Sequence, residues 1–242
     1  MKSHDGISRR RVLGMACAVG SFAISGGLST AWAQALRRTP DQILGPFYPV
    51  IKPVHQGTDL TIIPGKPGRA AGQVIHLMGR VVNPRGQPIQ GARMEIWQAN
   101  THGRYTHPGD TNPAPLDPNF EGFAVVTTDA EGRYRIKTVK PGAYPAGPDA
   151  RMRPPHIHFD VTGKSNRLVT QMYFAGEPLN DNDHFLQGAG AGKDRLIVPL
   201  RPPTQGLEPD SLVAVWDIVL DRANVAAAHE KRCAFPCAEA VN

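Results

Sequence analysis

The sequence predicts an all-β protein, a sandwich of two sheets whose strands are joined by long loops. Three observations support this fold class. Apolar and polar residues alternate over short stretches, turn-forming residues recur about every ten residues, and glycine (25) and proline (23) are abundant. Strong helical periodicity is confined to Ala223–Lys231, where we expect a short C-terminal helix.

Each expected strand is bounded by turn-forming residues. Asn83–Gly86 ends the first strand, and Asp129–Gly132 is expected to join the third and fourth strands as a hairpin. The last strand is apolar almost throughout, which is typical of a fully buried strand. In chain order, the expected strands are Val74–Val82, Ala92–Gln98, Phe123–Thr127, Arg133–Val139, His156–Thr162, Leu168–Phe174, Arg195–Leu200 and Val213–Leu220. Gln187–Lys193 is expected to be a flexible loop, without the spacing of a phosphate-binding loop.

The first 33 residues have the pattern of a secretory leader. Ser8–Leu13 (SRRRVL) resembles a twin-arginine motif, an apolar run follows from Val12 to Ile24, and Ala31–Ala33 (AWA) is a cleavage signal. A retained membrane anchor is the alternative, but the apolar run is short and contains Gly and Ser. We therefore expect a periplasmic or secreted protein with no stable membrane insertion after cleavage.

The remaining chain divides into three parts. An irregular, proline-rich arm at 34–70 should wrap the domain or a partner subunit, the β-sandwich domain spans 71–222, and a tail spans 223–242. In the tail, Cys233 and Cys237 are spaced C-x-x-x-C, and in an oxidising compartment a disulfide is favoured over free thiols.

Charge argues against a nucleic-acid partner. The formal net charge is +6, and the leader accounts for +3 of it, with four basic residues against one acidic residue. The mature chain is therefore only mildly basic. That balance is compatible with an anionic aromatic substrate.

Two tyrosines and a histidine pair are the candidate metal ligands. In an extended strand side chains alternate between faces, so His156 and His158 point the same way and can close on one metal ion. Imidazole suits iron, copper and zinc, while the phenolates of Tyr105 and Tyr144 favour a highly charged ion such as ferric iron. The H-x-H pattern alone is also typical of a strand with two outward polar residues. Trp97, in mid-strand, is expected to pack in the core.

These residues belong to a longer series of motifs between Ile43 and Asp221. The series is Leu44–Pro49, Gly91–Asn100, Gly103–Tyr105, Leu116–Phe120, Lys140–Pro145, Arg153–His158 and Thr170–Phe174. In their order and separation, the motifs resemble those of the intradiol ring-cleavage dioxygenases, and in particular the protocatechuate 3,4-dioxygenase branch.

The resemblance implies a β-sandwich of the intradiol dioxygenase type that cleaves a catechol-type aromatic diol with dioxygen, giving a muconate-type diacid. It implies one ferric ion, Fe(3+), per chain, held by Tyr105, Tyr144, His156 and His158. Tyr144 would also be catalytic, taking a proton from the substrate. Arg153 would stabilise the anionic intermediate, and Gln171 would orient the substrate or the arginine.

Two departures from the family pattern affect the substrate. Ala146 stands where the protocatechuate enzymes usually have tryptophan, and Pro155 stands where alanine is usual. The first change should enlarge or reshape the mouth of the pocket, so the sequence does not establish protocatechuate itself as the substrate or fix the substituents on the ring. The family's protocatechuate enzymes build sites between two related chains, whereas this chain could work alone or as a homo-oligomer.

Two other functions remain as alternatives. One is a secreted β-sandwich binding module with a vestigial metal site. The other is a zinc hydrolase that uses His156 and His158, for which Asp160 is the one nearby candidate for a general base.

The leader generates the first testable prediction. Replacing Arg9 and Arg10 together by lysine should leave the precursor in the cytoplasm, because the arginine pair is what the twin-arginine receptor recognises. Fractionation followed by immunoblotting measures this. Normal accumulation of the double variant in the periplasm would show that export uses another route.

Overall fold

The computed structural model describes residues 35–53, 57–147 and 151–221. The leader, the C-terminal helix expected at Ala223–Lys231, and Cys233 and Cys237 lie outside these residues. Among the described residues, none of the helices has the length and apolar character needed to span a bilayer.

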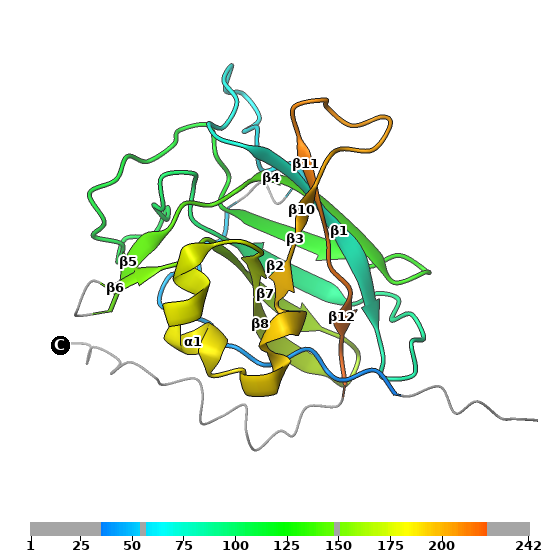
Figure 1. The fold of residues 1–242 in the computed structure, drawn as a ribbon. Helices are drawn as coiled ribbons and strands as arrows, with labels where there is room; N and C mark the ends of the chain where they lie inside the picture. The colour runs from blue at the N-terminus through cyan, green and yellow to red at the C-terminus, as the bar shows by residue number, and fades with distance from the viewer. Residues whose placement is uncertain (1–34, 54–56, 148–150, 222–242) are drawn as a thin grey trace, which may run out of the picture. The chain divides into compact units, whose positions relative to one another are not determined.

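The β-sandwich is confirmed, with two five-stranded mixed sheets and a separate two-stranded ribbon (Figure 1). The first sheet contains β1 (Val74–Val82), β4 (Arg133–Val139), β10 (Leu200–Arg201), β11 (Leu212–Val215) and β12 (Ile218–Val219). The second sheet contains β2 (Arg93–Trp97), β3 (Phe123–Thr127), β7 (His156–Thr162), β8 (Arg167–Phe174) and β9 (Ile197–Val198). The ribbon pairs β5 (Tyr144–Ala146) with β6 (Arg151–Arg153).

Alternation along β7 separates the core from the candidate site. Ile157, Phe159 and Val161 are fully buried in the main apolar cluster between the sheets. Each such side chain stabilises the fold by roughly 1.5–3 kcal/mol on burial. His156 and His158 therefore lie on the opposite face of β7, as the sequence pattern predicts.

The hairpin expected from Phe123 to Val139 is wrong. Asp129–Gly132 does form a tight turn, in which the amide of Gly132 donates to the carbonyl of Asp129 at 3.0 Å. However, β3 pairs with β2 and β4 pairs with β1, so the turn carries the chain from one sheet to the other. A turn motif specifies a reversal, whereas the choice of pairing partner depends on which sheet buries each strand.

The strand expected at Val213–Leu220 is interrupted in its middle. Both halves, β11 and β12, pair with β1 in the same register, and Trp216 and Asp217 interrupt the strand between them. The carbonyl oxygen of Trp216 lies only 1.9 Å from where a Cβ on Gly79 would be, so only glycine permits this approach. At this interruption the side chain of Asp217 accepts from the amide of Arg80 at 2.8 Å, so a carboxylate satisfies this backbone group.

The region between β8 and β11 contains further differences from the expected elements. The strand expected at Arg195–Leu200 is two short strands, β9 and β10, in different sheets on either side of Pro199. The loop expected at Gln187–Lys193 is mostly helical instead. Three helices, too short to give a sequence period, lie between β8 and β9: η1 (Pro178–Asn182), α1 (His184–Gln187) and η2 (Gly190–Arg195). The end of α1 and most of η2 fall within the expected loop.

The N-terminal arm binds both sheets by backbone hydrogen bonds. The amide of Thr39 donates to Val219 of β12 at 3.1 Å, and the amide of Gln42 donates to Val169 of β8 at 2.8 Å. Farther along the arm, Tyr48 and Lys52 both bond to the buried carboxylate of Glu95 on β2. These contacts hold the intervening arm residues against the second sheet.

Glu95 generates a stability prediction. Burial alone would raise its pKa, but hydrogen bonds from Lys52, Tyr48 and Arg93 lower the pKa to about 2. Glu95→Gln should lower the free energy of unfolding at pH 7 by roughly 1–3 kcal/mol, because a buried anionic acceptor of three hydrogen bonds becomes a neutral amide.

The pH dependence follows from the sign of this shift. Because the folded-state pKa of Glu95 is depressed, its contribution is complete above about pH 4.5 and is lost as the pH falls towards about 2. Denaturant titrations of both proteins should therefore converge in acid. An equal stability difference at pH 7 and at about pH 2 would contradict the assignment.

Candidate metal centre and active site

The structure brings together the four residues singled out as metal ligands. The hydroxyl of Tyr144 on β5 lies 3.1 Å from Nε2 of His156 on β7. The rings of Tyr105 and Tyr144 are 5.2 Å apart between centroids, and those of His156 and His158 are 4.9 Å apart. All four side chains are at most 3% exposed. Four potential metal-ligating side chains from three segments therefore converge where they are shielded from solvent.

Local structure explains how the two tyrosines come together. Gly103 has a positive φ of 77°, and a Cβ there would lie 2.2 Å from the carbonyl oxygen of Ala143. Glycine at this position therefore lets the loop that carries Tyr105 pack directly on the segment that leads into Tyr144. The carboxylate of Asp110 accepts from the amide of Tyr105 at 2.7 Å, which fixes the backbone of this loop.

Hydrogen bonding fixes the tautomer of His156. Its Nδ1 lies 2.7 Å from the carbonyl oxygen of Pro154, and a carbonyl oxygen only accepts, so Nδ1 carries the proton. The lone pair of Nε2 therefore points into the site. There it accepts from Nη1 of Arg153 at 3.0 Å and from the hydroxyl of Tyr144.

Two polar atoms in this site are buried without a partner in the described part of the chain. They are the hydroxyl oxygen of Tyr105 and Nδ1 of His158. Buried polar atoms are almost always hydrogen-bonded, so unpaired atoms at a convergence of donors indicate a missing ligand. Among the described residues, no three His, Cys, Asp or Glu side chains gather as a metal site, so the two tyrosines are essential to the donor set.

Burial keeps the two histidines and the two tyrosines uncharged. Burial lowers the pKa of His156 and of His158 well below the usual value, and the nearby Arg153 lowers both further. Burial also raises the pKa of both tyrosines, although for Tyr144 the charge of Arg153 opposes the rise. Two neutral imidazoles and two phenols fit a hard, highly charged cation, which converts the phenols to phenolates as it binds.

Arg153 is the centre of a buried hydrogen-bond network and is only 5% exposed. Its Nη2 donates to Oε1 of Gln171 at 2.9 Å and to the hydroxyl of Tyr173 at 2.8 Å. Its Nε donates to Oδ2 of Asp183 at 2.8 Å. The ring of Phe185 lies over the guanidinium, 4.6 Å from its central carbon.

Sequence reasoning missed three members of this network. Tyr173 could have been found, because it lies two residues after Gln171 on β8 and therefore shares its face. The register confirms that Tyr173 lies opposite His156, and Gln171 opposite His158. Asp183 and Phe185 belong to the short α1 region, for which the sequence carried no signal.

The arm and Trp97 close the other side of the site. Phe47 packs on Tyr105 with 4.7 Å between ring centroids, and Gly45 faces His158, where a Cβ would lie 3.0 Å from Cε1. Trp97 is buried, as expected, but its indole stacks on His158 at 4.9 Å. The side chain of Asp160 is bonded to Arg167 at 2.9 and 2.6 Å, which makes it unsuited to the general-base role that a zinc hydrolase would need.

A cavity of about 510 Å³ opens onto this centre. Tyr144 and Arg153 line it, together with Ala146, Phe47 and Phe185. Ala146 thus lies at the pocket, where a tryptophan would reduce the free volume.

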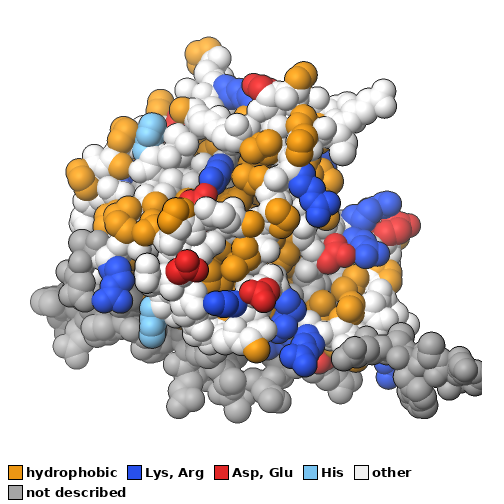
Figure 2. All heavy atoms as spheres, viewed as in Figure 1, with side chains coloured by type: hydrophobic (Ala, Val, Ile, Leu, Met, Phe, Trp, Pro, Cys, Tyr) orange, Lys and Arg blue, Asp and Glu red, His pale blue; other side chains and the backbone are white. Residues whose placement is uncertain are grey.

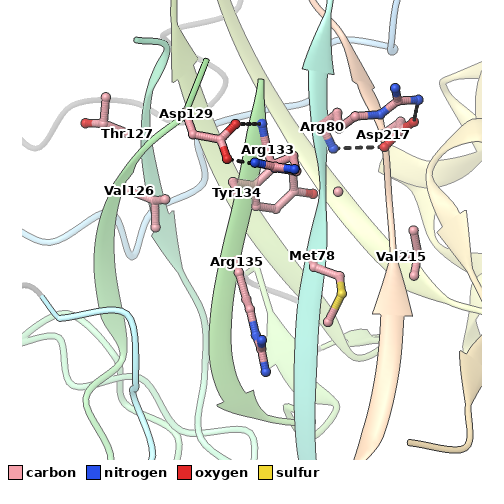
Figure 3. Close-up of a pocket in the computed structure, with 11 residues that line it drawn as sticks. Met78, Arg80, Val126, Thr127, Asp129, Arg133, Tyr134, Arg135, Val215 and Asp217 are labelled. Carbon is pink, nitrogen blue, oxygen red and sulfur yellow. Dashed lines mark hydrogen bonds and ion pairs between the residues drawn. The ribbon is translucent and has the colours of Figure 1, made fainter. Parts of the chain in front are cut away.

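A larger cavity of about 670 Å³ lies elsewhere, against β1 and β4, and none of the four candidate ligands lines it. In Figure 3 two of its three arginines are paired with carboxylates, Arg80 with Asp217 and Arg133 with Asp129. The face in Figure 2 likewise shows basic and acidic side chains interspersed among apolar ones.

Comparison with known proteins identifies the family. Residues 43–222 match the family model described as Dioxygenase. The protocatechuate 3,4-dioxygenase beta chain of Burkholderia cepacia is 51% identical over 167 residues, which cover 67% of this chain and 70% of that protein. Catechol 1,2-dioxygenase 1 of Acinetobacter lwoffii is 35% identical over 67% of this chain, and the match spans only 53% of that longer protein.

A solved structure agrees with these relatives. The dioxygenase domain of a dioxygenase carbohydrate-binding protein fusion from Streptomyces sp. SirexAA-E superimposes with a TM-score of 0.57 at 28% identity. The match covers 77% of this chain and all of that domain. The chain therefore belongs to the dioxygenase family, among the intradiol ring-cleaving dioxygenases.

Proposed function

We propose that the protein is a non-haem ferric enzyme that uses dioxygen to cleave a catechol-type ring between its two hydroxylated carbons. The observation that carries this proposal is the set of two buried tyrosines and two buried histidines beside a cavity that Tyr144 lines. Two polar atoms of this set have no hydrogen-bond partner among the described residues. The buried cation of Arg153 lies beside that set. A vestigial binding module would have no need for all five groups together.

Tyr105, Tyr144, His156 and His158 are the residues that would hold one ferric ion per chain. When bound, the ion supplies a Lewis-acidic and redox-active centre for the oxygens of the diol. The two phenolates offset most of its charge, and the imidazoles complete the protein's share of the donors. A position left open for substrate distinguishes a catalytic site from a structural one.

Tyr144 is the residue suited to take a proton from the diol. Tyr144 lines the cavity, whereas Tyr105 does not. As a phenolate, Tyr144 is a base whose acid form burial favours, because burial raises its pKa. The hydroxyl oxygen of Tyr144 would therefore hold the substrate proton after the diol binds.

Arg153 is the electrostatic partner of the reacting ring. Neighbouring side chains accept hydrogen bonds from Nε and Nη2 of Arg153, and Nη1 faces the site. A preorganised cation in a dry site stabilises negative charge that develops on the ring much more than it would in water. Gln171 bonds to Nη2 and to the carbonyl of Ile43 at 2.9 Å, so it would orient the arginine relative to the arm.

The substrate is proposed to be a protocatechuate-like aromatic diol. The relative from Burkholderia cepacia, a protocatechuate 3,4-dioxygenase beta chain, supports this class. Ala146 leaves room at the pocket wall for a ring with different or larger substituents. Dioxygen consumption with catechol, protocatechuate, hydroxyquinol and a gallate-type ring, together with loss of ring absorbance, would identify the preferred ring.

The metal is tested by changing one tyrosine. The wild-type protein should contain about one iron per chain and show a visible tyrosinate-to-iron(III) absorption band. Tyr105→Phe should lose the iron or shift and weaken the band, as measured by metal analysis and visible spectroscopy. The control is Tyr134→Phe, another buried tyrosine, whose hydroxyl instead donates to the carbonyl of Trp216 at 2.7 Å. Full iron and an unchanged band in Tyr105→Phe would refute the ligand assignment.

Arg153 is tested separately from the metal. Arg153→Ala should keep the iron and the visible band, because arginine is not a ligand, but kcat should fall by about a hundredfold, the scale for losing one preorganised electrostatic group. Arg151→Ala removes an exposed arginine from the same strand and should leave kcat unchanged. Near-normal turnover of an iron-loaded Arg153→Ala protein would rule out the electrostatic role.

A further inference from the structure

Asp183 is a buried carboxylate that engages Arg153 from the side. Its Oδ2 accepts from Nε of Arg153 at 2.8 Å, and its Oδ1 accepts from Nη2 at 3.2 Å. Both side chains are at most 6% exposed. A paired, two-point contact of this kind fixes the plane of a guanidinium as well as its position.

The contact leaves one nitrogen of the guanidinium for the site. Nε is bonded to Asp183, and Nη2 is bonded to Asp183, Gln171 and Tyr173. Nη1, by contrast, donates to Nε2 of His156, whose lone pair is the one that a metal ion would use. Metal binding to His156 would therefore release Nη1 while the other nitrogens stay anchored.

The same short helix covers the face of the guanidinium. Asp183 is the N-cap residue of α1, and its Oδ1 accepts from the amide of Leu186 at 2.8 Å. Phe185, two residues after Asp183, lies over the guanidinium and lines the cavity. Asp183 thus holds the edge of Arg153 while Phe185 blocks movement out of the plane.

We propose that Asp183 is a positioning residue for ring cleavage, which clamps Arg153 so that Nη1 alone points at the reacting ring. The inference rests on the proposed function, in which Arg153 stabilises negative charge on that ring. A merely structural role for Asp183 would consist of capping α1. Variants that still cap α1 but no longer bind Arg153 distinguish the two roles.

The kinetic experiment uses Asp183→Asn in the iron-loaded full chain. Asparagine caps helices as well as aspartate does, so α1 should keep its N-terminus while the ion pair is lost. We expect kcat to fall at least tenfold and KM to change less than twofold, with iron content and the visible band retained. The matched control is Asp181→Asn, an exposed acid two residues away, which should stay within twofold of the wild type.

Two further variants guard against a folding defect. Asp183→Ser also caps the helix but cannot reach the arginine, so it should lose as much rate as Asp183→Asn. Asp183→Glu restores the charge and should recover part of the rate relative to the serine variant. If Asp183→Asn and Asp183→Ser keep wild-type kcat, or if they lose the iron, the positioning role is overturned.

A second readout does not depend on turnover. In the metal-free full chain, ¹H–¹⁵N spectra of arginine side chains report hydrogen exchange at Nε. The Arg153 signal, assigned by its absence from Arg153→Ala, should exchange slowly in the wild type and at least tenfold faster in Asp183→Asn. If the exchange rate at Nε of Arg153 is the same in Asp183→Asn as in the wild type, the clamping role of Asp183 is overturned, whether or not the protein cleaves a diol. If the wild-type protein neither binds iron nor cleaves a diol, the proposed function is overturned, while the exchange measurement still decides whether Asp183 holds Arg153.

Discussion

A charged guanidinium buried beside two imidazoles is the constraint on which the rest of the site depends. Moving an ion out of water costs several kcal/mol even after relaxation, so Arg153 needs compensation from every side. Burial alone would lower the pKa of Arg153, but Tyr173, Tyr144 and Asp183 raise it overall, so the group stays charged. Its partners lie on β7, on β8 and at the N-cap of α1, and two of them reach the arm: Gln171 bonds to Ile43, and Tyr173 bonds to Gln42. One buried charge thus ties these segments and the arm to β6.

That charge also shapes the protonation of the donors around it. A cation beside neutral histidines opposes their protonation, and burial acts in the same direction. The metal-free site therefore presents imidazole lone pairs without a competing proton, while the phenols keep theirs until a strong cation displaces them. Coupling of metal binding to proton release is the usual consequence for such a donor set. The unpaired atoms of Tyr105 and His158 are a local cost in folding that a bound ion would offset.

The enclosing shell uses ordinary packing to protect this polar centre. Trp97 stacks on His158, Phe47 packs on Tyr105, and Phe185 covers Arg153, so aromatic rings exclude water from each of the chemically important groups. The arm that supplies Phe47 is held by the buried carboxylate of Glu95 through Tyr48 and Lys52. Access from solvent is through the cavity beside Ala146, where small side chains leave space for an aromatic ring.

The sequence by itself determined most of the strands, the shared face of His156 and His158, and the set of motifs that carry the family. Such features are local, since alternation fixes faces and turn residues fix reversals. Only the tertiary structure decided that β3 and β4 join different sheets, and that Trp216 interrupts the last strand where its carbonyl approaches Gly79. It alone identified Asp183 as the partner of Arg153. The physical reason is that strand pairing and charge compensation depend on residues distant in sequence, which no local pattern encodes.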